Sequence, residues 1–120
     1  MSLYLFQAAY TSDSWKHQVQ NVENVHERLR PLVEGLGGHI VGAYYAFGEY
    51  DVVILAEMPD DEAATAFSLA ANVGGSVKAL KTTSLLTVEQ GMNAMHKAAA
   101  AGKQYRPPVA QEAARETVPR

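Results

Sequence analysis

The sequence predicts an α+β domain whose strands and main helices follow the order strand–helix–strand–strand–helix–strand, with an added helix near the C-terminus. The central observation is residues 37–59, where two runs rich in Val, Ile, Tyr and Phe meet at Gly48-Glu49. Such a pattern is typical of a β-hairpin. On each side of this hairpin the chain has one amphipathic stretch and one further β-rich run. The order is that of the ferredoxin-like βαββαβ fold, a four-stranded antiparallel sheet with both main helices on one face.

The composition predicts one globular domain and excludes several functions. The 120 residues are 48% hydrophobic and 19% charged, and the net charge is -3. Because nucleic-acid binding depends on neutralised phosphates, we expect no nucleic-acid partner. The absence of cysteine excludes disulfides, thiolate nucleophiles and Cys-ligated metals. No signal peptide or membrane span is recognisable, so we expect a cytoplasmic protein without a membrane partner.

The N-terminal part predicts a strand and then one or two helices. Leu3–Tyr10 is a nearly continuous apolar run, as in a strand covered on both faces. Polar residues 11–14 supply candidate N-caps for the helix that follows. Pro31 predicts a kink or break near Glu27-Arg28, whereas residues 21–24 would alternatively separate two helices, with Asn24 capping the second. The apolar stripe of this segment is Trp15, Val19, Val22, Val25, Leu29, Leu32, Val33 and Leu36.

The second half predicts a helix, a strand, a further helix and a tail. Asp60 caps a helix rich in small residues that ends at Gly74-Gly75. Ser76–Val88 is then the last strand, and Glu89–Ala101 is an Ala- and Met-rich helix. We therefore divide the chain into a domain over residues 1–102 and a Pro-containing tail over residues 103–120.

Alternation along the hairpin assigns its side chains to two faces. Gly48 suits the first central position of a type II′ turn, which places Phe47 opposite Tyr50. We expect the helices to cover the side of His39, Val41, Ala43, Tyr45, Phe47, Tyr50, Val52, Ile54, Ala56 and Met58. The other side holds Ile40, Gly42, Tyr44, Ala46, Asp51, Val53, Leu55 and Glu57. That side is too apolar for water, so we expect it to pack against a second copy and to leave a cleft between the two sheets.

The candidate site residues lie on this second side and near the end of the first strand. Asp51 and Tyr44 are diagonal neighbours, and Asp51 in an apolar cleft would act as a general base. Alternatively, Asp51 holds the hairpin by accepting backbone N–H groups, which is the role we favour. His17 is the third catalytic candidate. Ligand-binding candidates are Tyr44, Asp51, Val53, Ile40 and Trp15, although Trp15 also suits a core anchor.

The sequence offers no metal or cofactor site. On a continuous helix, His17 and His26 would be about half a turn out of phase, so they would not share a metal ion. The glycine pairs at Gly37-Gly38 and Gly74-Gly75 lack the spacing of a phosphate-binding loop. We therefore expect neither a metal nor a cofactor.

Several separated motifs resemble one family. They are Leu36-Gly37-Gly38, Phe47–Val53 with its Gly48-Glu49-Tyr50-Asp51 segment, Met58–Asp61, Lys81–Thr87 and Tyr105–Pro108. Together they resemble the GYD domain proteins over roughly residues 1–108. The resemblance implies a dimeric α/β barrel built from ferredoxin-like domains, and it assigns no catalytic residue.

Two functional hypotheses follow. The first is a small homo-oligomeric module that binds a small, mostly apolar ligand in the cleft between packed sheets. The second is a cofactor-independent enzyme of the dimeric-barrel type, oxygenase- or isomerase-like, that uses Tyr44, Asp51 and His17. Binding is favoured because the sequence lacks a recognisable nucleophile, metal cluster or cofactor loop.

Overall fold

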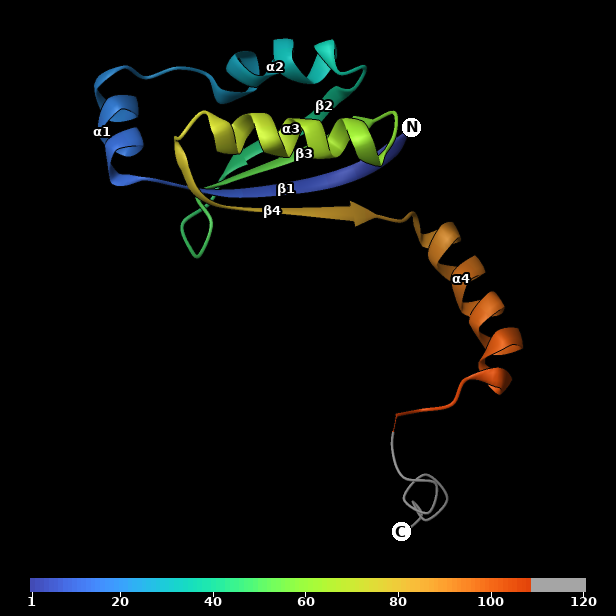
Figure 1. Ribbon diagram of the computed structural model, residues 1–120. Helices are drawn as coiled ribbons and strands as arrows, with labels where there is room; N and C mark the ends of the chain where they lie inside the picture. The colour runs from blue at the N-terminus through green and yellow to red at the C-terminus, as the bar shows by residue number, and fades with distance from the viewer. Residues whose placement is uncertain (109–120) are drawn as a thin grey trace. The chain divides into compact units, whose positions relative to one another are not determined.

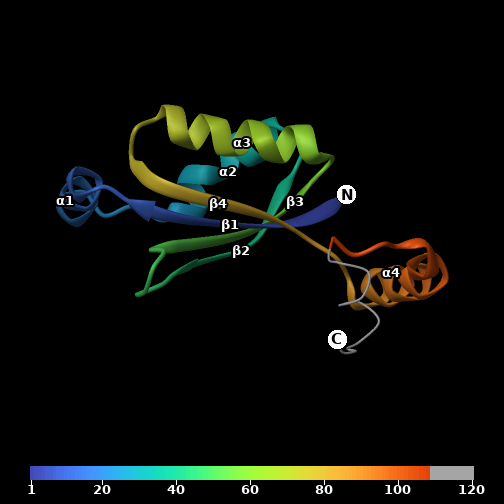
Figure 2. The same ribbon diagram turned by 60° about the horizontal axis from the view of Figure 1, so that its bottom comes forward.

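The structure, a computed structural model, describes residues 1–108. Its sheet is antiparallel with the strand order β2–β3–β1–β4. These strands are β1 (Ser2–Tyr10), β2 (His39–Tyr45), β3 (Val52–Met58) and β4 (Val77–Leu85). Helices α2 (Val25–Gly35) and α3 (Asp61–Val73) lie on one face of the sheet, and α1 (Ser12–Gln20) follows the end of β1 (Figures 1 and 2). The predicted α+β, ferredoxin-like fold is confirmed.

The chain divides into two compact units, Met1–Leu86 and a second unit that begins at Thr87. The second unit contains α4 (Val88–Ala101) and the short 3₁₀ helix η1 (Gly102–Gln104). A capping box at Thr87 and Gln90 starts α4 one residue before the predicted helix. The predicted boundary at residue 102 stays a prediction, and residues 109–120 of the predicted tail lie outside the described residues. In the part of the chain that is described, no helix has the length and apolar character needed to cross a bilayer.

The segment after β1 forms two helices, as the second of the two sequence interpretations predicted. Thr11 caps α1 by accepting the N–H of Ser14 at 3.0 Å. Asn24 caps α2, because its Oδ1 accepts the N–H of Glu27 at 3.1 Å. Pro31 lies inside α2. The chain therefore breaks at residues 21–24, where asparagine side chains compete for backbone groups, and not at Glu27-Arg28.

The hairpin has the predicted register near its loop but a different turn. Tyr45 pairs with Val52, and the N–H of Ala46 donates to the carbonyl of Asp51 at 2.8 Å. The expected type II′ turn is wrong, because Gly48 has no positive φ; among the described glycines only Gly37 and Gly75 do. The connection is a longer loop whose Phe47 is 99% exposed and does not face the helices.

A register shift in β2 changes the face of two residues. Gly42 pairs with Leu55, whereas Ile40 pairs with Ala56, so Val41 is an extra residue in the ladder. Such a bulge reverses the side-chain alternation beyond it. Ile40 therefore packs against the core under the helices, and His39 lies beside Glu57 with a ring nitrogen 3.2 Å from the carboxylate. The predicted faces of His39 and Ile40 were wrong for this reason.

The core lies between the sheet and the two helices. Alternate residues of β1 and β3 point into it, and Phe6 meets Phe67 of α3 edge-on with ring centroids 4.7 Å apart. Gly38 is required at the start of β2, since a Cβ there would lie 2.3 Å from the carbonyl oxygen of Glu57. The buried core residues are Tyr4, Phe6, Ala8, Tyr10, Val25, Val33, Val52, Ile54, Ala56, Met58, Ala64 and Phe67.

A tyrosine links β1 to the first turn of α3. The hydroxyl of Tyr4 donates to the carboxylate of Asp61, while the Tyr4 side chain is buried. This hydrogen bond, together with burial and the negative charges of Asp61 and Asp60, raises the pKa of Tyr4 to about 12. The folded protein therefore keeps a proton at alkaline pH that an unfolded tyrosine would release near pH 10.

Replacing Tyr4 by phenylalanine tests this link. Between pH 10 and about 12 the unfolded state binds fewer protons at Tyr4 than the folded state, so the stability that this group contributes falls as the pH rises. We expect Tyr4→Phe to lower the free energy of unfolding by about 1–2 kcal/mol at pH 7 and to reduce the loss above pH 10. Urea denaturation at pH 7, 10 and 11 measures both effects. The exposed Tyr44→Phe serves as the control, and an equal alkaline loss in Tyr4→Phe and the parent would contradict the assignment.

Candidate functional site

The main apolar pocket of the described residues lies between the sheet and its two helices. We call it the helix-side pocket. Its volume is about 230 Å³. It is lined by Phe6, Ala8, Tyr10, Arg28, Leu29, Leu32, Val52, Ile54, Phe67, Ala70, Ala71, Gly74, Ser76, Val77 and Leu80. An apolar cavity with a few polar groups is the common form of a small-molecule site.

The pocket forms because α3 carries small side chains near its C-terminal end. Phe67 fills the space over Phe6, but one turn later Ala70 and Ala71 line the pocket without reaching across it. On the opposite wall, Leu29 and Leu32 of α2 contribute apolar surface. The result is a hollow with apolar walls made of both helices and three strands.

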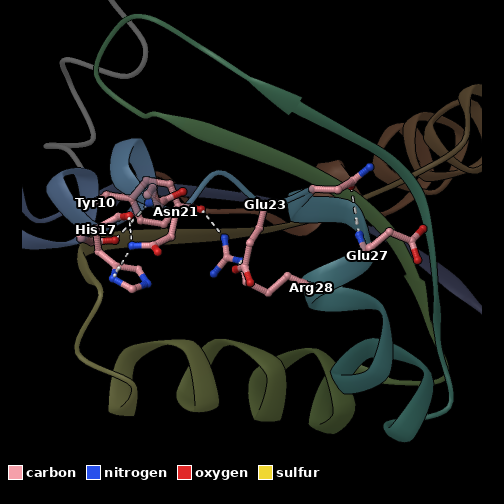
Figure 3. Close-up of polar contacts among 9 residues, drawn as sticks. Tyr10, His17, Asn21, Glu23, Glu27 and Arg28 are labelled. Atoms are coloured by element: carbon pink, nitrogen blue, oxygen red, sulfur yellow. Dashed lines mark hydrogen bonds and ion pairs between the residues drawn. The ribbon is translucent and has the colours of Figure 1, made fainter.

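The polar groups of the pocket include Arg28 and Tyr10. Figure 3 shows the Arg28 side chain extending from α2 toward Tyr10 at the end of β1. An Arg28 Nη donates to the Tyr10 hydroxyl at 3.3 Å, and Arg28 Nε lies 3.9 Å from the carboxylate of Glu23. The Arg28 side chain is 37% exposed, so it lies at the mouth of the pocket. Arg28 is the one charged residue among those that line it.

The environment keeps the Tyr10 phenol protonated at neutral pH. Burial raises the pKa of Tyr10, while the hydrogen bond from Arg28 and the positive charge of Arg28 act in the opposite direction. The phenol oxygen accepts from Arg28 and still carries its own proton. Tyr10 is therefore able to donate a hydrogen bond to a further acceptor.

Asp51 makes the contacts that its structural role predicts. Its Oδ2 accepts the backbone N–H of Tyr10 at 2.8 Å and the indole N–H of Trp15 at 3.3 Å. Its own N–H donates to the carbonyl of Ala8 at 2.8 Å. Asp51 thus ties the end of the hairpin loop to the end of β1 and to α1.

The structure does not bring the three catalytic candidates together. Tyr44 lies on β2 and is 59% exposed, and its ring covers Gly42 so closely that a Cβ at that glycine would lie 2.9 Å from the ring. His17 is exposed on α1, with Nδ1 3.4 Å from the side-chain nitrogen of Asn21 (Figure 3). In residues 1–108 no hydrogen bond joins Tyr44 or His17 to Asp51.

The ligand-binding candidates are also distributed over different surfaces. Ile40 packs against the core, as described above, whereas Val53 lies half-buried on the face opposite the helices, paired with Tyr44. Trp15 is half-buried and lines a shallow hollow of about 200 Å³ with Val19 and Val22 of the α1 side. Of the predicted set, the structure joins Asp51 to Trp15 by a hydrogen bond and Tyr44 to Val53 as a cross-strand pair.

The face of the sheet opposite α2 and α3 is mostly apolar, and we call it the open sheet face. Its centre consists of partly exposed residues of the two middle strands, and no segment of residues 1–86 covers it (Figure 2). Where the hairpin loop meets this face, a hollow of about 350 Å³ includes Gln7, Val53 and Lys81. The open sheet face comprises Leu3, Leu5, Gln7, His39, Gly42, Tyr44, Val53, Leu55, Glu57, Lys81, Thr83 and Leu85.

The helix-side pocket is not among the sites predicted from the sequence. Two signals pointed to it. Arg28 lies three residues after the core residue Val25 and next to Leu29, so it places a charge at the margin of the apolar stripe of α2. Ala70 and Ala71 belong to the predicted helix rich in small residues, and their short side chains leave space over the sheet. No group of three His, Cys, Asp or Glu that could hold a metal ion occurs among residues 1–108.

Comparison with known proteins identifies a family and a fold. The family model described as GYD domain matches residues 4–95. No curated protein matches the chain. The solved structure described as FFRP-DM1 is similar with a TM-score of 0.52 and 16% identity, covering 72% of this chain and all of that one. The protein At3g17210 from Arabidopsis thaliana has a TM-score of 0.47 and 11% identity, covering 73% and 96% of the two chains.

Proposed function

This chain belongs to the GYD domain family, and we propose that it is a small homo-oligomeric domain that binds a small, mostly apolar molecule in the helix-side pocket. The pocket itself carries the proposal. It is apolar on most of its wall, and its polar groups include Arg28 and Tyr10 at one end. This arrangement supports a ligand that is held by shape and burial and oriented by one polar end.

The size of the pocket limits the ligand. Its volume of about 230 Å³ is below the ~300–1,000 Å³ that is usual for drug-sized ligands. A dry cavity of about 150 Å³ is known to hold benzene. The ligand we propose is therefore about as large as one substituted aromatic ring or a short acyl chain.

The open sheet face supports the homo-oligomeric part of the proposal. Leu5 of β1 lies opposite Leu55 of β3, and both are partly exposed within the first unit. An apolar sheet face needs cover, and a second copy supplies a matching surface about a two-fold axis. In such a dimer the hollow beside Val53 would become a cleft between the sheets, which is where the sequence analysis placed the ligand.

Filling the helix-side pocket tests the ligand-binding proposal. We expect Ala71→Leu to abolish binding of neutral one-ring probes, toluene and phenylacetamide, while the protein remains folded, because the larger side chain occupies the ligand's space. Backbone amide NMR shifts measured during titration report both the affinity and the residues that respond.

Ala66→Leu is the matched control, because Ala66 lies on the same helix but lines a shallow hollow on its outer side. It should leave binding unchanged. Probes that shift the amides of Val53 and Tyr44, and that still bind to Ala71→Leu, would place the ligand on the open sheet face. Probes that fail to bind the parent protein at millimolar concentration would refute the proposal.

A further inference from the structure

The mouth of the helix-side pocket carries one positively charged side chain. Arg28 is the one charged residue that lines this pocket, and no carboxylate does. A guanidinium stays protonated at every pH at which proteins are stable. The pocket therefore presents a fixed positive charge beside apolar walls.

Arg28 has more N–H donors than its described contacts use. Its guanidinium carries five N–H groups, and in the described residues its side chain contacts the Tyr10 hydroxyl at 3.3 Å and Glu23 at 3.9 Å. The contact with Glu23 is long, and the Glu23 side chain is 64% exposed, so this ion pair contributes little and a ligand displaces it at low cost. The planar guanidinium then has paired N–H groups that match the two oxygens of a carboxylate.

Tyr10 adds a second donor at the same place. Its hydroxyl oxygen accepts from Arg28, so its own proton is available to a ligand acceptor. The rest of its side chain is buried and packs edge-on against Trp15 at 5.3 Å. This packing fixes the phenol relative to the pocket before any ligand arrives.

We propose, on the basis of the function proposed above, that the ligand is a small organic carboxylate. Its anionic group binds Arg28 and the Tyr10 hydroxyl. Its apolar body, of about one aromatic ring or an equivalent acyl chain, occupies the space between Phe67, Leu29 and Leu32. The carboxylate lies toward the pocket mouth, where Arg28 is partly solvated, and the body lies over the sheet.

A matched pair of probes tests this inference. Phenylacetate and phenylacetamide have nearly the same shape, but only the first is an anion. We expect the parent protein to bind phenylacetate about tenfold or more tightly than phenylacetamide, because charge-assisted hydrogen bonds to Arg28 are stronger than neutral ones. Affinities are measured by the same NMR titration at low ionic strength.

Variants of Arg28 and its neighbours test whether Arg28 causes the preference for phenylacetate. Arg28→Gln should remove the advantage of phenylacetate over phenylacetamide, and the amide NMR spectrum of the variant shows whether it is folded. Arg28→Lys should retain part of the preference for phenylacetate, since an ammonium keeps the positive charge but lacks the paired N–H groups of a guanidinium. Glu23→Gln should leave phenylacetate binding equal or slightly stronger, because the ion pair that it removes contributes little. Arg30→Gln is the control, since Arg30 is paired with Glu27 on the same helix and does not line the pocket.

The outcomes separate this inference from the function on which it rests. If the parent bound the two probes with equal affinity and Ala71→Leu bound neither, the proposed preference for a carboxylate would be refuted. The pocket would still be supported as the binding site. A preference for phenylacetate that Arg30→Gln reduces as much as Arg28→Gln would show general charge attraction, and it would also refute the inference. Binding of neither probe would refute both proposals.

Discussion

Replacing Leu55 by lysine should convert the proposed dimer to a folded monomer. Leu55 lies on the middle strand β3, between Leu5 of β1 and Gly42 of β2, at the centre of the open sheet face. In a sheet-to-sheet dimer this position is removed from water, and an ammonium there would lose its hydration without gaining a partner. We expect dimer affinity to fall by about two orders of magnitude or more.

The monomer should keep its fold, because Leu55 points away from the helices and is already partly exposed within one chain. Sedimentation equilibrium measures the mass, and thermal denaturation shows whether the core is intact. Leu69→Lys is the control: Leu69 is 59% exposed on α3, and the same change there should leave the mass unaltered. A parent protein that sediments as a monomer at tens of micromolar would remove the proposed dimer altogether.

Side-chain alternation predicted the faces of β3 correctly and those of β2 only in part. In β3 the residues Val52, Ile54, Ala56 and Met58 are all buried, as their two-residue period predicts. In β2 the same reasoning held for Ala43 but failed for His39 and Ile40. The bulge at Val41 causes the failure, because one extra residue reverses the alternation. Gly42, which follows Val41, is the local signal of this bulge, because an isolated glycine inside a strand often marks one.

Local signals identified helix ends better than turns and cavities. The caps at Asn24 and Asp60 are set by side chains one turn from the groups they bind, so the sequence was sufficient to predict them. The hairpin loop depends on longer-range contacts: the N–H of Asp51 bonds to β1 and not within the loop. The helix-side pocket depends on the spacing of two helices over a sheet, which no single segment determines.

The carboxylate of Asp51 should contribute more to the free energy of unfolding than any other polar group of the hairpin. A single oxygen, Oδ2, accepts from both the Tyr10 N–H and the Trp15 indole, and Tyr10 is buried. Asp51→Ala removes this oxygen and leaves a buried donor unpaired, so we expect a loss of about 2–4 kcal/mol in the free energy of unfolding. Asp51→Asn keeps one acceptor oxygen that is able to serve both donors, so its loss should be about 1 kcal/mol.

Two independent measurements compare Asp51→Ala with Asp51→Asn. Chemical denaturation gives the two stabilities, and Trp15 fluorescence in the folded state reports whether the indole N–H still has its partner, since Trp15 is the only tryptophan of the chain. We expect Asp51→Asn to keep the parent spectrum and Asp51→Ala to change it. Equal losses in the two variants would show that the oxygen is not the stabilising group. If Asp51→Asn kept the parent's stability and spectrum but lost turnover of a screened substrate, Asp51 would be a catalytic base, as the enzyme hypothesis requires.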